Sequence, residues 1–254
     1  LNTSGYKSNV TGFSIGTQFE YLDDLRFGLS TRNTIEKIDV DSSASTKQKK
    51  QDGNYFDSFI GLDFFYDKRN QKYQTTSGFF SNFNVSMPIL SDTNTLTNNY
   101  NYKIFKELYE NNVSTFSFSF QGANSLSGDD IKLSERLYIP GRKLRGFESG
   151  KIGPKDGSDY IGGNYVSTIN ATTTIPNILE NVQSVDIVMF ADAANIWGVD
   201  YDSALDKNGI RSSVGIGLDW LTPVGPLTFS FAQPITKEPT DIEETFRFNI
   251  GTSF

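Results

Sequence analysis

The sequence of 254 residues is long enough for one large all-β domain or two small ones, and its net charge of −7 excludes the basic surface needed to bind nucleic acid. It contains no cysteine and no histidine, which excludes disulfides, thiolate chemistry, a Ser-His-Asp triad and histidine metal ligands. No apolar run approaches the about 18 residues of a membrane-spanning helix, so any membrane crossing must use strands.

The amino-acid content favours strands with one apolar and one polar face. There are 21 Phe and 12 Tyr, yet only 37% of the residues are hydrophobic. Many aromatic residues among Ser, Thr, Asn and Gly are typical of a transmembrane β-barrel, whose outer surface is apolar and whose interior is wet. A soluble β-sandwich is the alternative, but it would have to bury these aromatic faces between two sheets.

Apolar and polar residues alternate with a period of two along most of the chain. In residues 12–21, Phe13 and Ile15 are separated by small or polar residues, and in residues 113–124 three Phe alternate with Thr and Ser. Eleven strands are predicted in this way, at residues 12–21, 25–38, 55–66, 79–89, 100–109, 113–124, 162–175, 185–197, 212–221, 227–234 and 245–254.

The predicted connections alternate in length. Tight ones fall at residues 23, 111, 176–184 and 221–226. Longer ones lie between them, such as the charged segment 39–53, which is expected to be a solvated loop, and the segment 91–97. This alternation indicates an antiparallel outer-membrane barrel. An odd number of strands begins and ends on opposite sides of the membrane, whereas bacterial barrels have even numbers. We therefore expect the chain to be the C-terminal portion of a larger barrel.

The longest segment without strand character is 125–160, and a loop of this length in a β-rich chain is usually functional. It contains Leu144 and Phe147 on either side of Arg145 and Gly146. A cation and an aromatic ring are thus presented together on a tight turn that glycine permits. The glycines and apolar residues predict a loop that docks onto another surface.

Six motifs occur from about residue 137 to residue 254 in the order and spacing of a known family. They are R-K-L-R-G-F, K-I-G-P-K-D, I-G-G-N-Y, F-A-D-A-A-N-I-W, G-L-D-W-L-T-P-V-G-P-L-T-F-S-F-A-Q-P-I and F-R-F-N-I-G-T-S-F. Together they resemble the C-terminal barrel of the BamA family of outer-membrane protein assembly factors. The upstream strands match this family in pattern only.

The resemblance implies a barrel of about sixteen strands preceded by periplasmic POTRA repeats. Residues 1–254 would then be a single, partial barrel domain of the bacterial outer membrane, without the POTRA region and roughly the first five strands. In the family, the long loop folds back into the lumen and the arginine of its R-G-F motif contacts acidic residues of the barrel wall. This implies a lumen site at Arg145, Gly146 and Phe147, with Asp192 as the wall partner.

Strand alternation supports the position of Asp192. In residues 185–197 it lies on the face opposite Ile187 and Met189, and a carboxylate that faced lipid would be costly. In the partly dehydrated lumen, a guanidinium and a carboxylate form a charge-assisted, two-bond pair. Such a pair is expected between Arg145 and Asp192.

The chain departs from the family at one position of this site. Thr172 stands where the neighbouring strand of many relatives carries a glutamate. The contact of Arg145 would therefore rest on a single carboxylate.

The final strand resembles the C-terminal signal by which outer-membrane proteins are recognised for assembly. Its aromatic and apolar residues alternate with polar or small ones; they are Phe246, Phe248, Ile250 and Phe254. In the family the same strand forms one side of the seam with the first strand, and a weakly paired edge can template an incoming strand. Gly251 would weaken packing at that edge.

The resemblance implies a factor that folds and inserts β-barrel proteins into the bacterial outer membrane. Its partners would be the lipid bilayer, unfolded barrel clients and accessory lipoproteins, with no cofactor and no metal. The sequence carries no phosphate-binding or nucleophile motif. Two alternatives stay open: a two-partner secretion transporter, which shares the POTRA-plus-barrel plan, and a passive porin, in which the loop is only a constriction.

An enzyme is the least favoured class. Asp129 and Asp130 lie in loop sequence, and an acid–base pair would need burial that nothing in the sequence indicates. Asp200, Asp202 and Asp206 have a loose calcium-like spacing, but the glycine and glutamate of an EF-hand are absent. These three residues are expected to form a solvated loop.

Overall fold

A computed structural model describes residues 2–3, 5–72, 74–110, 112–175, 185–206, 208–222 and 225–251. One antiparallel sheet dominates it, which confirms the predicted all-β barrel class. Its ten long strands are β2 (Tyr6–Leu22), β3 (Leu25–Val40), β4 (Gly53–Asp67), β5 (Gly78–Ser91), β6 (Thr95–Tyr109), β7 (Asn112–Ser125), β11 (Tyr165–Ile175), β12 (Val185–Trp197), β13 (Arg211–Thr222) and β14 (Gly225–Thr236), and the shorter β16 (Phe246–Ile250) follows them. A short strand, β1 (Asn2–Thr3), pairs with the start of β2.

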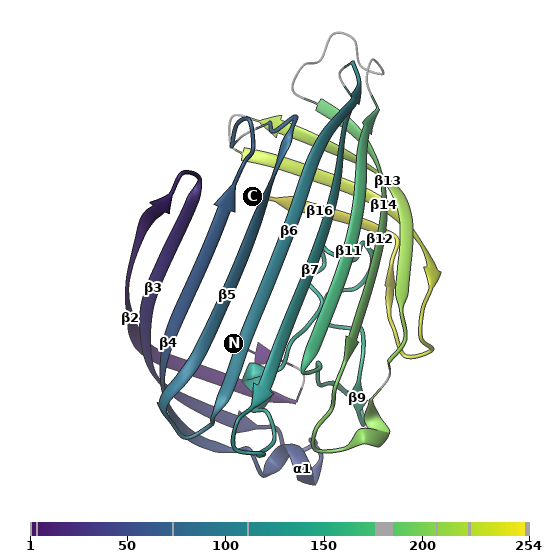
Figure 1. Cartoon of the computed structure of the whole chain (residues 1–254). Helices are drawn as coiled ribbons and strands as arrows, with labels where there is room; N and C mark the ends of the chain where they lie inside the picture. The colour runs from purple at the N-terminus through teal and green to yellow at the C-terminus, as the bar shows by residue number, and fades with distance from the viewer. Residues whose placement is uncertain are drawn as a thin grey trace.

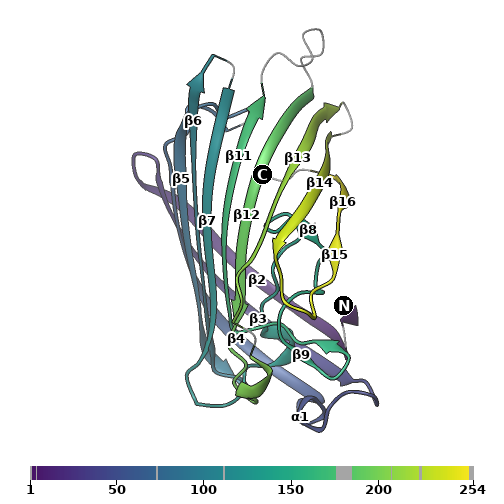
Figure 2. The same cartoon turned by 90° about the vertical axis from the view of Figure 1, so that its right-hand side faces the viewer.

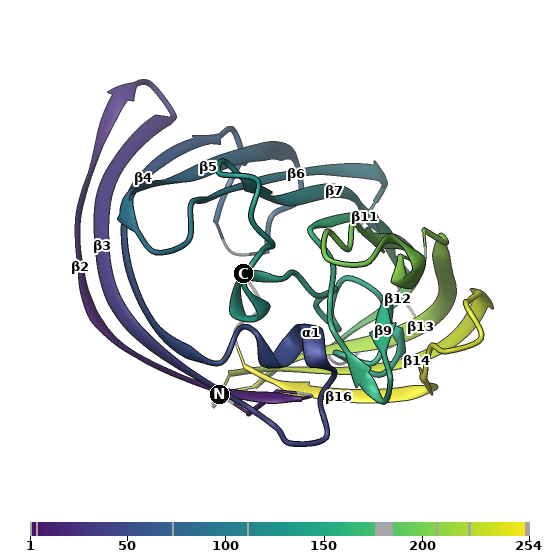
Figure 3. The same cartoon turned by 90° about the horizontal axis from the view of Figure 1, so that it is seen from below.

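The long strands are neighbours in the sheet in sequence order. β7 pairs directly with β11, because the segment between them leaves the sheet. Seen from below, the sheet curls around this segment as the wall of a barrel (Figure 3). The tight β2–β3 turn lies at the upper end of the wall in Figure 1, and the connection that contains α1 (Thr46–Lys49) lies at the lower end. These two connections lie on opposite sides, but length does not separate all of them, because residues 68–77 join β4 to β5 on the side of the tight turn and only residues 92–94 join β5 to β6 on the other side. The tight connection predicted at 176–184 lies outside the described residues.

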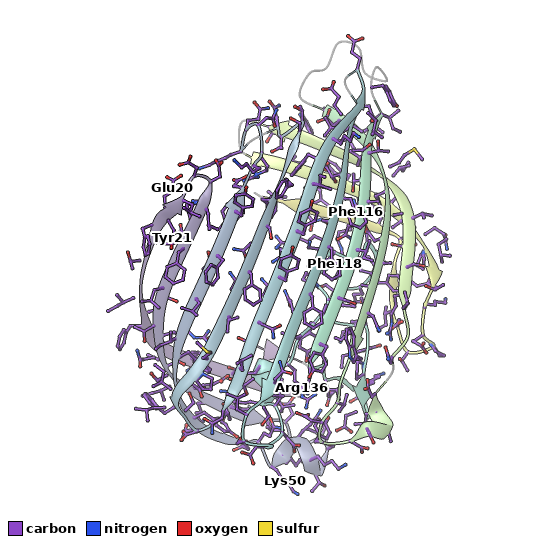
Figure 4. All side chains as sticks on the ribbon, in the orientation of Figure 1. Glu20, Tyr21, Lys50, Phe116, Phe118 and Arg136 are labelled. Atoms are coloured by element: carbon purple, nitrogen blue, oxygen red, sulfur yellow. The ribbon has the colours of Figure 1, made fainter. Side chains whose placement is uncertain are left out.

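Side chains alternate between the outer face of the wall and the lumen. In β12, Met189 is 51% exposed on the outer face, whereas Phe190 and Asp192 are buried on the lumen side. Figure 4 shows Phe116 and Phe118 on the outer face of β7. A strand that crosses a membrane needs such an apolar outer face.

Several strands extend further than the alternation predicted. β2 begins at Tyr6 and β6 begins at Thr95, so the loop expected at 91–97 is reduced to residues 92–94. These extensions consist mostly of polar residues, which weakens the period of two. The segment 39–53 is not a fully solvated loop either, since it contains α1, whose Gln48 is 2% exposed.

The segment that leaves the sheet, residues 126–164, is here called the lumen loop, and Figure 2 shows its strands β8 and β9 inside the wall. Its short elements are η1 (Leu133–Glu135), β8 (Gly146–Phe147), β9 (Lys155–Asp156) and β10 (Asp159–Tyr160). A buried apolar cluster joins the loop to β11 and β12; its members are Ile139, Leu144, Phe147, Ile152, Val166, Ala194 and Ile196. The wet interior that the sequence suggested is therefore closely packed in this region. No helix of the described residues has the length and hydropathy to cross a membrane.

Candidate functional site

The Arg145 side chain lies against β12 and forms an ion pair with Asp192. Its Nε donates to Oδ2 of the carboxylate and its Nη2 donates to Oδ1, each at 2.7 Å, while the backbone N–H of Arg145 donates to Oδ2 at 3.1 Å. The Asp192 side chain is 0% exposed and that of Arg145 is 15% exposed. This is the planar, two-bond geometry that makes arginine–carboxylate pairs strong and specific in direction.

Two further wall residues complete the binding site of Arg145, and neither was named from the sequence. Asn170 on β11 lies opposite Asp192, and its Nδ2 donates to Oδ1 of Asp192 at 2.9 Å and to the carbonyl of Lys143 at 2.7 Å. The guanidinium carbon of Arg145 lies 3.4 Å from the centroid of the Phe190 ring. Alternation places both residues on the lumen face of their strands, but it does not indicate which loop residue they meet.

Thr172 lies on the same strand as Asn170, two residues further on, and is opposite Phe190 in β12. The second wall residue that contacts the site is thus an amide that donates to Asp192, and not the additional carboxylate of many family members. Among the contacts of the described residues, Asp192 is the carboxylate that pairs with Arg145.

Gly146 allows the loop to approach the wall closely. Its φ of +92° lies in the region that favours glycine, and a Cβ there would lie 3.2 Å from Ala232 and 3.3 Å from Ser213. The Ser213 hydroxyl donates to the carbonyl of Arg145 at 2.5 Å. The next residue, Phe147, is 0% exposed within the apolar cluster. The three residues of the motif therefore bind the wall through charge, backbone approach and apolar burial respectively.

The motif also contacts the segment that precedes the last strand. β8 pairs in antiparallel fashion with β15 (Glu243–Glu244). On β16, Arg247 donates from Nη2 to the carbonyl of Phe147 at 2.6 Å and from Nε to the Glu244 carboxylate at 2.8 Å. The lumen loop is therefore held both by β12 and by the beginning of β16.

The last strand is short and carries apolar residues on its outer face. Phe246, Phe248 and Ile250 are 46%, 43% and 71% exposed, while Phe254, with residues 252–253, lies outside the described residues. Five residue pairs join β16 to β14, and two cross-strand ring pairs have centroids 4.8 Å apart. Such ring pairs stabilise neighbouring strands. The other edge of β16 ends the described sheet.

A buried cation in the lumen loop contacts a different part of the wall. Lys132 Nζ lies 2.5 Å from Asp57 Oδ2, 3.0 Å from Glu36 Oε2 and 3.6 Å from Glu135 Oε1, and the lysine side chain is 2% exposed. Burial raises the pKa of the Glu135 carboxyl above its ordinary value. This group, the Lys132 cluster, holds the beginning of the loop to β3 and β4.

The three acidic residues after β12 each have a partner within the protein. Asp200 pairs with the buried guanidinium of Arg136, which Figure 4 labels near the lower end of the molecule. Asp202 pairs with Lys47 at 2.9 Å, and Asp206 accepts two bonds from a backbone N–H. Asp200 is an exposed residue, as expected of a solvated loop, but its carboxylate is also the counterion of a buried cation, a contact that the sequence did not indicate.

Residues 2–254 match the family model of the Omp85 superfamily domain. The chain belongs to the Omp85 superfamily. It is 30% identical over 174 residues to the outer membrane protein assembly factor BamA of Neisseria meningitidis, covering 55% of this chain and 22% of that protein. It is 26% identical over 257 residues to BamA of Neorickettsia risticii, covering 98% and 34%. The crystal structure of Haemophilus ducreyi BamA lacking POTRA domains 1–3 has a TM-score of 0.87 at 23% identity, over 96% of this chain and 54% of that one.

The Omp85 assignment confirms the predicted family and the outer-membrane location. The fold similarity extends over the upstream strands, where the sequence resembled the family in pattern only. The chain spans 22% to 34% of the length of these two curated relatives.

Proposed function

We propose that this Omp85 domain is part of a factor that folds β-barrel proteins and inserts them into the bacterial outer membrane. The observation that carries the proposal is the match to curated assembly factors, which extends along 98% of the chain in one relative. The proposed partners are the lipid bilayer, unfolded barrel clients and accessory lipoproteins. The proposed activity makes and breaks no covalent bond and uses no cofactor.

The geometry suits this activity in two ways. The outer face of the wall is apolar and fits lipid, whereas the lumen is closed in part by a docked loop. The last strand is held to β14 by five residue pairs, and its backbone at the other edge can pair with an extended segment of a client. Strand pairing at this edge, within a disturbed bilayer, would therefore promote the folding and insertion of the client.

The test is reconstitution of the intact protein in liposomes, with an unfolded porin as client. The rate at which the porin becomes protease-resistant is measured with and without the protein. Acceleration of client folding is the expected result. Unchanged client folding together with steady ion conductance would refute the proposal and favour a secretion pore or a passive porin.

A further inference from the structure

The start of the last strand is bound to the lumen loop through both backbone and side chain. The β8–β15 pair is extended by two backbone bonds, from Glu148 N–H to the Ile242 carbonyl at 2.9 Å and from Ile242 N–H to the Lys151 carbonyl at 3.1 Å. Residues 242–244 therefore run alongside residues 146–151 as a second, smaller sheet inside the wall. A single residue, Thr245, separates this attachment from β16.

Arg247 strengthens this attachment from within β16. It lies on the lumen face of the strand, between the outward Phe246 and Phe248, and its side chain is 10% exposed. One guanidinium binds the carbonyl of Phe147 and the carboxylate of Glu244 together. It therefore joins the R-G-F turn, the β15 segment and the last strand.

The guanidinium of Arg247 occupies a space that the loop leaves for it. A Cβ at Gly141 would lie 2.0 Å from Nη1 of Arg247, so any larger residue there would displace the guanidinium. That Nη1 atom is buried and has no hydrogen-bond partner among the described residues. A buried donor left unpaired costs free energy, so Nη1 does not favour this position of the side chain. The bonds of the other guanidinium nitrogens to Phe147 and Glu244 therefore hold the Arg247 side chain in place.

We propose that Arg247 is a latch that makes release of the last strand and withdrawal of the R-G-F turn a single event. The inference rests on the proposed function, because it concerns the strand that a client would engage. When a client strand pairs with β16 and moves the first residues of β16 outward, Arg247 moves with them and pulls on the Phe147 carbonyl that it binds. That carbonyl is two residues from Arg145, which holds the loop to Asp192. Coupling of this kind is reciprocal, so loosening either contact loosens the other.

The test is amide hydrogen exchange of the intact protein in detergent micelles, without client. In Arg247→Ala, exchange is expected to rise about tenfold or more in both residues 246–250 and residues 146–151, as loss of a charge-assisted hydrogen bond predicts. Asn249→Ala is the matched control, because Asn249 lies on the same face of β16 and no described contact joins it to the loop. Unchanged exchange in either segment of Arg247→Ala would overturn the latch.

Two further variants keep the test decisive if Arg247→Ala fails to fold. Gly141→Ala displaces the guanidinium without removing it and is expected to raise exchange in the same two segments. Arg145→Ala, which loosens the loop from the wall, is expected to raise exchange in residues 246–250 although no contact among the described residues joins Arg145 to that strand. Normal exchange in residues 246–250 of both variants would refute the coupling. Because no client is present, this result is independent of the assembly assay.

Discussion

Arg145 is the counterion of a carboxylate, Asp192, that has no exposed surface. Removal of the cation leaves a buried charge without its counterion, which costs about 3–5 kcal/mol. Arg145→Ala should therefore lower the unfolding free energy by about this amount, measured by urea titration, and should slow client assembly. Arg145→Lys should have an unfolding free energy between those of the wild type and Arg145→Ala, because lysine keeps the charge but loses the planar two-bond geometry.

A double-mutant cycle separates the pair from other effects of these substitutions. Arg145→Ala combined with Asp192→Ala should destabilise the protein by clearly less than the sum of the two single substitutions. Strict additivity, or wild-type heat-modifiability and assembly rate in Arg145→Ala, would contradict the importance of this contact.

Asn170 binds Asp192 and the loop backbone together, so its amide should matter even though it carries no charge. Asn170→Ala is expected to cost about 1–3 kcal/mol of unfolding free energy, because the buried Asp192 carboxylate loses one of its donors and the Lys143 carbonyl loses the Asn170 amide. Ser167→Ala, on the outer face of the same strand, is the control and should change stability little. Equal effects of the two substitutions in urea unfolding would show that the Asn170 contacts are dispensable.

Alanine substitutions at Gly146 and Gly150 distinguish the cost of backbone strain from the cost of steric crowding. Both have positive φ, but a Cβ at Gly150 would meet nothing within 4 Å, whereas one at Gly146 would crowd Ala232 and Ser213. Alanine at Gly150 should cost about 1–2 kcal/mol through its backbone conformation alone. Alanine at Gly146 should cost more and should also slow assembly. The unfolding free energies of the two variants provide the comparison, and a larger loss at Gly150 would contradict it.

The Lys132 cluster makes a prediction about pH. Lys132→Met removes the cation from Glu36, Asp57 and Glu135 and should cost about 3–5 kcal/mol near neutral pH. Burial already raises the pKa of Glu135, and loss of the lysine raises it further. The folded variant then binds more protons than the unfolded chain, so its stability should rise as the pH falls from 8 toward about 5.

Urea unfolding across this pH range, compared with the wild type, checks the sign of the effect. The difference in unfolding free energy between the two proteins should shrink as the pH falls. A difference that is constant with pH would mean that the Glu135 carboxyl does not respond to the lost cation.

The strands and their faces were predictable because contact with lipid on one side and the lumen on the other imposes a period of two. That period gave eleven strands and the face of Asp192, but it missed the extensions of β2 and β6, where most residues are polar and the alternation is weak. The Arg145–Asp192 contact was expected from a family resemblance and not from the residues alone. Asn170 and the partners of Lys132 were missed because alternation gives the face of a residue, and contacts across the lumen join positions far apart in the chain.

The position of the lumen loop in the chain bears on when the barrel can be completed. The R-G-F turn precedes both of its partners, Asp192 and Arg247, in the chain. Arg247 follows Phe147 by 100 residues. During synthesis the turn is therefore made long before the segments that bind it, and contacts of such large sequence separation form late. A chain cut just before Glu243 could still join Arg145 to Asp192 but could not form the β8–β15 pair. Full docking of the turn thus requires that β15 and Arg247 have already been synthesised.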